Sequence, residues 1–376
     1  MGKDDLELQM KFCGCCHSDL HNAAGQVKIM GETKYPIVPG HELCGIVVAA
    51  GENVTGFAVG DAVGIGCIVD SCLACKQCKD GNEHKCLNGM TGTYNAGDKH
   101  GRAAVFPPGS QTLGGYSTRM VINKHFAIKV PKTYPLEMVG PVMCAGVTMY
   151  SPLMNFGVTH GTRVGIVGLG GLGQMGVSIA KAMGAVVTVI STNSSKTELA
   201  TRCGATGFVV SADSKQMKDA AGSLDLILNT VPTHHNYAQY NRLLDFKAKK
   251  AYQVILGLHA GLAAALILDA VTGGNSRIKM SGIGSIKETQ EVIDLCDKNK
   301  IYPEIAVVPV TQLNDVYTKL DASNQSGVRY VLDISTLKPD VICDAPPPIL
   351  GKDSTNMTLG AGLWDCCSLF FCCKWY

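Results

Sequence analysis

Hydrophobic and polar residues alternate near the N-terminus, and short apolar runs then recur between glycines. Every second position there is hydrophobic, at Leu6, Leu8, Met10 and Phe12. A period of two residues is typical of a half-buried strand. Two further apolar runs begin near Cys44 and Gly60 and are bounded by turn-forming glycines. The pattern predicts a β-rich module over residues 1–140, interrupted by a cysteine-rich segment.

The pattern changes near Cys144, where apolar strands begin to alternate with helical segments. The expected strands are residues 164–167, 185–190, 224–228 and 253–256. The expected helices are residues 174–183, 196–203 and 287–298, followed by a last helix that extends to residue 324. Alternation of strands and helices predicts a parallel sheet with crossover helices on its faces. The whole chain is therefore expected to have an α/β fold.

The composition agrees with a folded protein of two domains. Of the 376 residues, 46% are hydrophobic and 17% are charged, which supports a large buried core. The formal net charge is only +2, so the chain lacks the basic surface that binds nucleic acid. The longest apolar run, Val254 to Leu268, is shorter than the roughly 20 residues of a membrane span and predicts a buried strand and helix. We expect no nucleic-acid partner and no transmembrane segment.

Cysteine usage indicates metal binding rather than a disulfide framework. The chain has 17 cysteines, an odd number, and its N-terminus lacks the features of a secretory signal, which favours a reducing, cytoplasmic location. Four of the cysteines follow one another as C-x2-C-x2-C-x7-C, at Cys72, Cys75, Cys78 and Cys86. This spacing predicts a zinc site, and an iron–sulfur cluster fits the seven-residue gap less well. Because four protein ligands leave no open position, the zinc should be structural.

A glycine-rich fingerprint follows the first expected strand of the second half. The pattern G-x-G-x-x-G is formed by Gly168, Leu169, Gly170, Gly171, Leu172 and Gly173. It lies between an apolar strand and a helix, which is the context in which such glycines let backbone N–H groups approach a pyrophosphate. The fingerprint predicts a dinucleotide-binding site.

The residues after the second expected strand favour NADP(H) over NAD(H). An NAD-preferring site needs an acidic residue about 20 positions past the fingerprint, where it binds the ribose hydroxyls. Here the region is hydroxylated and basic, with Ser191, Thr192, Asn193 and Lys196. It has no carboxylate at the strand end to repel a 2′-phosphate, and its hydroxyls and ammonium group are suited to bind one. The alternative is a serine-rich helix start that tolerates either cofactor.

Three further segments carry metal-binding residue types, although each is a weak signal alone. They are CGCCHSDLH from Cys13, PGHE from Pro39 and GPVMCAGVT from Gly140. Together with the four-cysteine segment, GLGGLG and GSIKETQEVIDLC, they make the chain resemble the zinc-dependent medium-chain alcohol dehydrogenases. The resemblance is greatest to the cinnamyl alcohol dehydrogenase-like branch, and its motifs occur in the family's order over residues 5–336.

The resemblance implies a fold and domain boundaries. A GroES-like, β-rich catalytic domain would comprise residues 1–144, completed by residues 285–336, and would carry the structural zinc lobe. A Rossmann domain with a doubly wound parallel sheet, residues 145–284, would bind NADP(H). Residues 337–376 have no counterpart in the family and are expected to form a poorly ordered tail.

The resemblance also implies a second, catalytic zinc ion. Its ligands would be Cys16, His41 and Cys144. Glu42 would lie beside the metal, as a transient ligand or as a supporting acid. Ser18 and His21 occupy the positions of the family's proton relay. The neighbouring cysteines that do not match the motif, and that are expected to pack as ordinary thiols, are Cys13, Cys15 and Cys44.

Less specific features complete the expectation. Further cofactor contacts are implied at Thr148, Thr230, Gly257 and Ile283. The stretch Gly92 to Gly115 is longer than its family counterpart and is expected to form a mobile loop. Family members are commonly dimers, so a homodimer is expected.

The expected function is reversible hydride transfer between primary alcohols, aromatic, allylic or aliphatic, and aldehydes. The enzyme would use NADP(H) and two zinc ions per chain, and its partner is a small alcohol or aldehyde. Two alternatives remain open: a reductase of activated C=C or C=N bonds on the same scaffold, and an inactive, zinc-stabilised binding protein. The presence of both relay residues favours the alcohol dehydrogenase.

Overall fold

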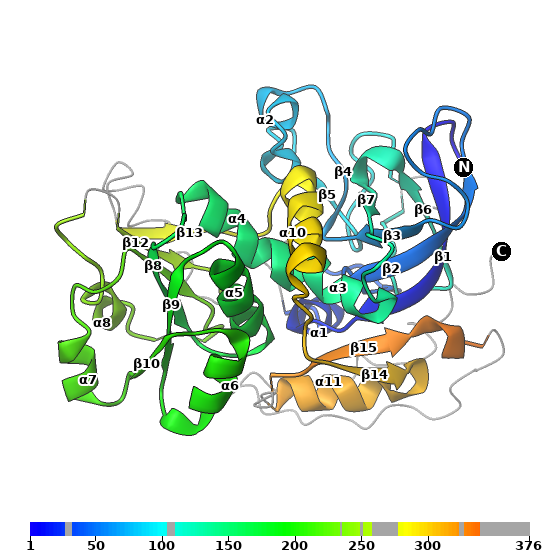
Figure 1. Ribbon diagram of the computed structural model, residues 1–376. Coiled ribbons are helices and arrows are strands. Elements are labelled where there is room, and N and C mark those ends of the chain that lie inside the picture. Colours follow the sequence, from blue (N-terminus) through cyan, green and yellow to red (C-terminus); the bar gives the residue numbers. More distant parts are fainter. Residues whose placement is uncertain are drawn as a thin grey trace. The chain divides into compact units, whose positions relative to one another are not determined.

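The computed structural model describes residues 1–26, 32–103, 110–233, 235–248, 251–257, 277–322 and 327–338. The chain divides into two compact units, which are described separately (Figure 1). Unit 1 contains Met1–Cys144, Ser285–Ile293 and the described residues from Glu304 onward. Unit 2 contains Ala145–Gly284 and Asp294–Pro303. Residues 258–268 of the long apolar run and the tail after residue 338 lie outside the described residues.

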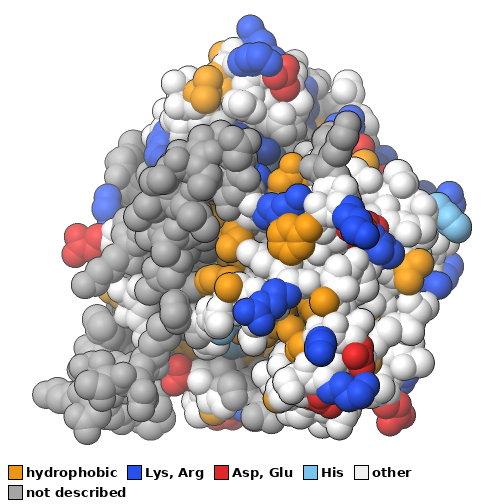
Figure 2. Space-filling model, turned by 90° about the vertical axis from the view of Figure 1, so that its left-hand side faces the viewer, with side chains coloured by type: hydrophobic (Ala, Val, Ile, Leu, Met, Phe, Trp, Pro, Cys, Tyr) orange, Lys and Arg blue, Asp and Glu red, His pale blue; other side chains and the backbone are white. Residues whose placement is uncertain are grey.

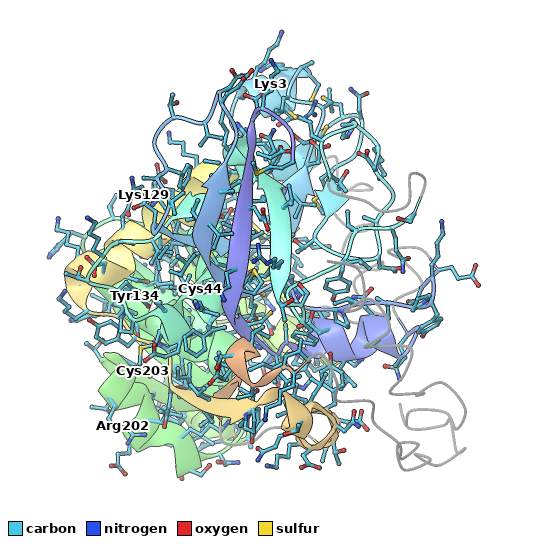
Figure 3. All side chains as sticks on the ribbon, turned by 90° about the vertical axis from the view of Figure 1, so that its right-hand side faces the viewer. Lys3, Cys44, Lys129, Tyr134, Arg202 and Cys203 are labelled. Carbon is cyan, nitrogen blue, oxygen red and sulfur yellow. The ribbon has the colours of Figure 1, made fainter. Side chains whose placement is uncertain are left out.

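Unit 1 is built on a seven-stranded sheet. Its strand order is β14-β15-β1-β2-β3-β7, and β6 also pairs with β1. The strands are β1 (Asp5–Gly14), β2 (Leu43–Ala50), β3 (Ala62–Ile65), β6 (Arg119–Asn123), β7 (Ile128–Lys129), β14 (Ile305–Pro309) and β15 (Arg329–Asp333). Figure 3 shows β1 between its antiparallel neighbours β2 and β6. Because β15 pairs with the last residues of β1, this first strand is a central strand of the sheet.

The alternation of β1 places its hydrophobic side chains in the core of unit 1. Leu6 and Leu8 are fully buried and Met10 is 3% exposed, as a half-buried strand requires. The thiols expected to pack are also buried: Cys13, Cys15 and Cys44. Burial raises the pKa of Cys44, which lies on β2 (Figure 3), to about 12, so this thiol stays neutral.

Helices and short turns of unit 1 carry the residues with candidate chemistry. The helices are α1 (His17–Ala23), α2 (Lys76–Lys79), α3 (Val139–Pro141) and α11 (Leu313–Asp321). A π-helical turn, Val142–Gly146, follows α3. A two-stranded sheet of β4 (Ile68–Asp70) and β5 (Thr91–Gly92) flanks the four-cysteine segment. Local periodicity does not predict α1, which is only seven residues long and begins directly after β1.

Unit 2 contains a six-stranded, fully parallel sheet with the order β10-β9-β8-β11-β12-β13. The strands are β8 (Arg163–Val167), β9 (Val186–Ser191), β10 (Gly207–Val210), β11 (Leu226–Asn229), β12 (Tyr252–Ile255) and β13 (Ile278–Met280). Its helices are α4 (Val147–Asn155), α5 (Gly171–Ala182), α6 (Thr197–Cys203), α7 (Ser214–Asp219) and α8 (Ala238–Asn241). Helix α10 (Ile286–Asn299) belongs to unit 1 up to Ile293 and to unit 2 from Asp294 onward.

The strand order of unit 2 identifies a doubly wound fold. The chain starts at β8, builds outward through β9 and β10, and then returns to the other side of β8 with β11. Such a reversal creates a switch point at the carboxyl ends of the central strands, where nucleotides bind. The doubly wound parallel sheet expected for this half of the chain is therefore confirmed.

The last helix is slightly shorter than expected. The last expected helix ends at Asp321 in the structure, three residues short of the expected end. No helix in the described part of the chain is long and apolar enough to cross a lipid bilayer.

Candidate active site and metal centres

Two groups of metal-type side chains converge in unit 1. In the first group each residue offers one ligand atom, and these atoms all lie within 4.8 Å of one another: Cys16, His41, Glu42 and Cys144. Cys16 ends the turn after β1, His41 precedes β2, and Cys144 sits in the π-helical turn. The Nε2 atom of His41 lies 3.2 Å from the Sγ atom of Cys144. Three segments that are far apart in the sequence thus bring two sulfurs and one imidazole together.

Asp19, on helix α1, orients this group. Its Oδ1 atom lies 2.8 Å from Nδ1 of His41 and also accepts the Gly40 N–H group at 3.1 Å. Its Oδ2 atom accepts the Cys16 N–H group at 3.0 Å. The fully buried carboxylate therefore holds His41 with Nε2 on the side of the Cys144 sulfur, where a metal would bind, as carboxylates commonly do behind metal-binding imidazoles. Burial alone would lower the pKa of His41, but Asp19, together with the thiols of Cys67 and Cys16, outweighs it and raises this pKa well above its usual range.

Glu42 is fully buried beside the same group. Neither carboxylate oxygen accepts a hydrogen bond within the described residues, and Oε1 lies 3.3 Å from the guanidinium of Arg329 on β15. Burial raises the pKa of Glu42 to about 7, although Arg329 opposes the shift. A buried carboxylate with unused oxygens next to two thiols and an imidazole suits a cationic metal.

The thiols of the group shift one another's pKa values. The contact between the Cys144 and Cys16 side chains holds the pKa of Cys16 well below its usual range and raises that of Cys144. A third thiol, Cys67, also contacts Cys144, and its pKa is lowered by that contact. Two thiols and one imidazole are the ligand types of a Cys2His zinc site, so the residues present fit a zinc ion.

The two expected relay residues lie on helix α1. The Nδ1 atom of His21 is 2.7 Å from the side-chain oxygen of Gln26. The carbonyl of Ser18 accepts hydrogen bonds from the Asn22 amide at 2.8 Å and from the Tyr94 hydroxyl at 3.3 Å. No hydrogen bond among the described residues joins Ser18 directly to His21, so a relay between them would need a bridging group.

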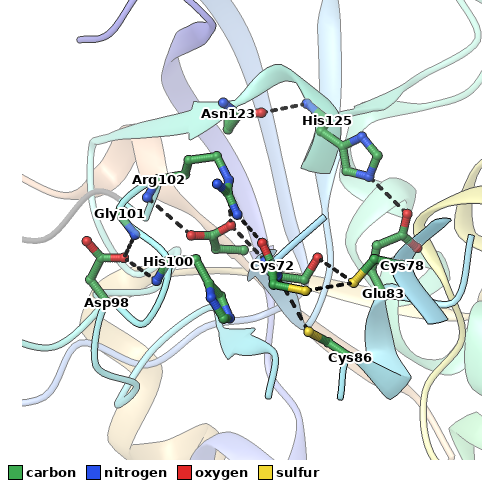
Figure 4. A network of polar contacts seen from close by, with 12 residues as sticks. Cys72, Cys78, Glu83, Cys86, Asp98, His100, Gly101, Arg102, Asn123 and His125 are labelled. Carbon is green, nitrogen blue, oxygen red and sulfur yellow. Dashed lines mark hydrogen bonds and ion pairs between the residues drawn. The ribbon is translucent and has the colours of Figure 1, made fainter. Parts of the chain in front are cut away.

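The second group is the four-cysteine lobe, of which Figure 4 draws Cys72, Cys78 and Cys86. Its sulfurs lie within 4.8 Å of one another and belong to Cys72, Cys75, Cys78 and Cys86. The Sγ atoms of Cys75 and Cys78 are 3.5 Å apart, and those of Cys72 and Cys78 are 3.8 Å apart. Backbone N–H groups of Ala74 and Cys75 lower the pKa of Cys72 to about 5, which favours its thiolate. Four converging sulfurs fit a structural zinc ion.

The glycine-rich fingerprint lies where β8 ends and α5 begins. Gly168 adopts a left-handed conformation with φ of +87°, and Gly170 caps the twelve-residue helix. A Cβ atom on Gly173 would lie 2.1 Å from the carbonyl oxygen of Gly168, so the tight turn requires a glycine there. The chain thus presents the N-terminus of α5 on a loop without side chains at these positions, which suits a pyrophosphate.

A Gly173→Ala substitution should destabilise unit 2 even without cofactor. The new methyl group meets a backbone oxygen that cannot turn away, and such overpacking costs about 1–3 kcal/mol. Thermal unfolding of the cofactor-free protein measures the effect as a lower Tm. Gly170→Ala is the matched control, because a Cβ atom at Gly170 meets no atom within 4 Å. Equal Tm values for the two variants would contradict the packing argument.

The segment after β9 has the composition expected for a 2′-phosphate site. Ser191 ends the strand, and Thr192 and Asn193 are exposed. Asn193 accepts the Ser195 N–H group at 3.0 Å, which shapes the turn. The Lys196 ammonium reaches back to the Leu169 carbonyl at 3.2 Å, so it lies beside the fingerprint loop.

The less specific cofactor positions all fall in unit 2. The Thr230 hydroxyl donates to the Val167 carbonyl at 2.9 Å and therefore braces the end of β8. A Cβ atom on Gly257 would lie 2.1 Å from the Val231 carbonyl oxygen, so this glycine allows two strand ends to approach. Thr148 and Ile283 are half-buried. No hydrogen bond of the described residues involves the Thr148 hydroxyl.

Sequence reasoning missed three residues that contact the first metal group. Asp19 lies in the motif CGCCHSDLH, but sequence reasoning gave it no role. Its place two residues after His17 could have indicated a role beside the metal ligands. Arg329 and Cys67 carry no motif of their own. Arg329 reaches the group because β15 pairs with β1, and Cys67 reaches it from the turn after β3.

Comparison with known proteins agrees with this architecture. The family described as "Alcohol dehydrogenase GroES-like domain" matches residues 2–132, and "Zinc-binding dehydrogenase" matches residues 171–298. "Cinnamyl alcohol dehydrogenase 2" of Rauvolfia serpentina is 42% identical over 340 residues, covering 90% of each chain. "Vomilenine reductase" of the same organism is 40% identical over 340 residues, again covering 90% of each.

A solved structure is similar over nearly the same span. The cinnamyl alcohol dehydrogenase of Helicobacter pylori complexed with NADP(H) has 36% sequence identity and a TM-score of 0.74, covering 90% of this chain and 92% of the other. With both family matches and relatives at this level of identity, the chain belongs to the zinc-dependent medium-chain alcohol dehydrogenases, in the cinnamyl alcohol dehydrogenase-like branch.

Proposed function

We propose that this protein is an NADP(H)-dependent alcohol dehydrogenase that interconverts primary alcohols and aldehydes with the help of zinc. The observation that carries the proposal is the convergence of Cys16, His41 and Cys144 beside a buried carboxylate that has unused oxygens. Cys16, His41 and Cys144 would hold a zinc ion, which when bound would lower the pKa of an alcohol substrate.

The chain's own residues prepare this chemistry. Asp19 fixes the ring of His41, and Arg329 holds the Glu42 carboxylate in place from β15. Asp19 is fully buried and the Arg329 side chain is only 13% exposed, so water competes little for their contacts. We assign Cys16, His41 and Cys144 as ligands and Glu42 as the adjacent acid.

Ser18 and His21 are proposed to carry the alcohol proton to solvent. A proton relay needs groups that both donate and accept, and a hydroxyl and an imidazole do so. The Nδ1 atom of His21 already contacts Gln26 near the surface, which gives the relay an outer end. The four-cysteine lobe is proposed to hold a second, structural zinc ion.

Cofactor binding is assigned to unit 2. The fingerprint glycines would receive the pyrophosphate at the start of α5, and Ser191, Thr192, Asn193 and Lys196 would bind the 2′-phosphate. Thr148, Thr230, Gly257 and Ile283 are proposed to line the rest of the cofactor's path.

A homodimer and a cytoplasmic location complete the proposal. Strand β13 ends the six-stranded sheet and, among the described strands, pairs only with β12, so its outer edge can receive a second copy. Figure 2 shows a face on which hydrophobic and basic side chains are interspersed. All described cysteines are free thiols, as in a reducing compartment. Analytical ultracentrifugation should give twice the chain mass.

A panel of alcohols and aldehydes, tested with both nicotinamide cofactors, examines the proposal directly. We expect turnover of benzyl or cinnamyl alcohol with NADP and a much lower kcat/KM with NAD. Metal analysis of the same protein should give two zinc ions per chain, one for each group of ligands. Intact protein that carries zinc and NADPH but turns over no alcohol would instead support an inactive binding protein.

A reductase of activated C=C or C=N bonds is the second candidate. The relative named "Vomilenine reductase" is nearly as similar to this chain as the dehydrogenase from the same plant, which favours keeping this candidate. The presence of both Ser18 and His21 suits alcohol chemistry better, because an alcohol must lose a proton from oxygen. Consumption of NADPH by a conjugated alkene or an imine, without turnover of any alcohol, would select the reductase.

A further inference from the structure

The long loop between β5 and β6 makes hydrogen bonds to neighbouring segments in its described part. Its part from Asp98 to Arg102 is fastened to the four-cysteine lobe (Figure 4). Asp98 Oδ1 accepts the backbone N–H groups of His100 at 3.4 Å and of Gly101 at 2.8 Å, which gives this part a defined turn. These contacts give fixed partners to one part of the stretch Gly92 to Gly115, whose mobility stays a prediction, and residues 104–109 lie outside the described part of the chain.

Arg102 fastens the loop to the segment that enters the lobe. Its Nε atom donates to Oδ1 of Asp70 at 3.0 Å, and its backbone N–H group donates to Oδ2 at 3.2 Å. The same guanidinium donates through a second nitrogen to the Ser71 carbonyl. Asp70 is fully buried, so its charge is neutralised mainly by this one arginine.

The contacts of Arg102 lead directly to the ligands. Ser71 is fully buried and precedes Cys72, and its N–H group donates to Asp70 at 2.7 Å. The Cys78 thiol donates to the Ser71 hydroxyl at 3.4 Å. Arg102 thus holds the backbone of Ser71, which directly precedes Cys72 and whose hydroxyl contacts the Cys78 thiol.

The loop also holds the segment that leaves the lobe. The Nε2 atom of His100 lies 2.6 Å from the Gly89 carbonyl oxygen, and the Lys99 ammonium donates to the Met90 carbonyl at 3.4 Å. Gly89 follows the last ligand, Cys86, and its N–H group donates to the Cys86 carbonyl at 3.0 Å. One short stretch of loop therefore ties together the two chain segments between which all four sulfurs lie.

We infer that Asp70 and Arg102 form a clamp that slows the release of zinc from the four-cysteine lobe. The clamp opposes the separation of the entering and leaving segments, and that separation must occur before the sulfurs can part. Arg102 acts as a positioning residue, because it contacts Asp70 and Ser71 and none of the four sulfurs. The inference rests on the proposal that the lobe holds zinc, but it does not depend on turnover.

The test measures zinc release from the full-length, zinc-loaded protein into an excess of a chromophoric chelator. Arg102→Met keeps an unbranched aliphatic stem but removes every donor of the guanidinium. We expect release from the lobe to be about 10–100-fold faster, in line with the loss of metal affinity when groups behind metal ligands are changed. Arg102→Lys keeps the charge without the fork and should fall in between. Lys76→Met is the control, since it removes an exposed ion pair of the same lobe and should change the rate less than about twofold.

Alkylation of cysteines identifies the ion that leaves. During release, peptide mass spectrometry should find faster alkylation of the lobe cysteines in Arg102→Met, with unchanged protection of Cys16 and Cys144. Equal acceleration at both groups would mean general unfolding and would overturn the clamp, as would a wild-type rate of release in Arg102→Met. A wild-type protein whose lobe cysteines are unprotected from the start would reject the zinc site itself, which is a separate failure.

Discussion

A Cys144→Ser variant should lose about 10³-fold or more of kcat/KM for alcohol oxidation while retaining one zinc ion per chain. Serine is a weaker ligand than a thiolate, so the metal at the Cys16 and His41 group should be lost or misplaced. Stabilisation by the metal is worth several kcal/mol, and each 1.36 kcal/mol corresponds to a factor of ten in rate. Steady-state kinetics and metal analysis of one preparation give both quantities.

Two controls separate this effect from damage to the fold. Cys203→Ser changes a thiol of unit 2 that belongs to neither metal group and should keep both zinc ions and normal turnover. NADPH binding by Cys144→Ser, measured by fluorescence titration, should stay close to that of the wild type, because the proposed cofactor site lies in unit 2. Turnover of Cys144→Ser at the wild-type rate would remove this residue from the catalytic group.

A Ser191→Asp variant should reverse the cofactor preference. The new carboxylate would stand at the end of β9, where NAD-binding members of this fold class hold the ribose hydroxyls. It would also repel a 2′-phosphate, and a like-charge contact of several kcal/mol predicts a loss of roughly 10²–10³-fold in kcat/KM with NADP. The kcat/KM with NAD should rise relative to that with NADP.

Ser191→Asn is the matched variant for this prediction. It has nearly the size of aspartate but no charge, so it separates repulsion from crowding. We expect Ser191→Asn to lose far less of the NADP-dependent kcat/KM than Ser191→Asp does. If both variants lose the same amount, crowding explains the loss and the phosphate is bound elsewhere.

Local patterns predicted the parts of the fold that depend on neighbours in sequence. The alternation of Leu6, Leu8 and Met10 predicted β1, and the apolar run before Gly168 predicted β8 and the turn into α5. These elements follow from one physical rule each, namely burial on one face of a strand and the need for glycine in a tight turn. The spacing of the four-cysteine segment is local in the same sense, and its sulfurs do converge.

Contacts between distant segments could not be found in this way. Arg329 reaches Glu42 only because β15 pairs with β1, and Arg102 reaches Asp70 only because its loop folds back. Helix α1 is too short to show a period, and its start is set by the capping contact between Asp19 and the Cys16 N–H group. The convergence of Cys16, His41 and Cys144 was expected from family resemblance, since no single segment contains it.

Crystals of the purified protein, measured at the zinc absorption edge, test the central claim most directly. The account predicts two anomalous peaks per chain, one bounded by Cys16, His41 and Cys144 and the other by the four lobe sulfurs. A map with a strong peak in the lobe but none between Cys16 and His41, from protein that oxidises alcohols at full rate, would contradict it.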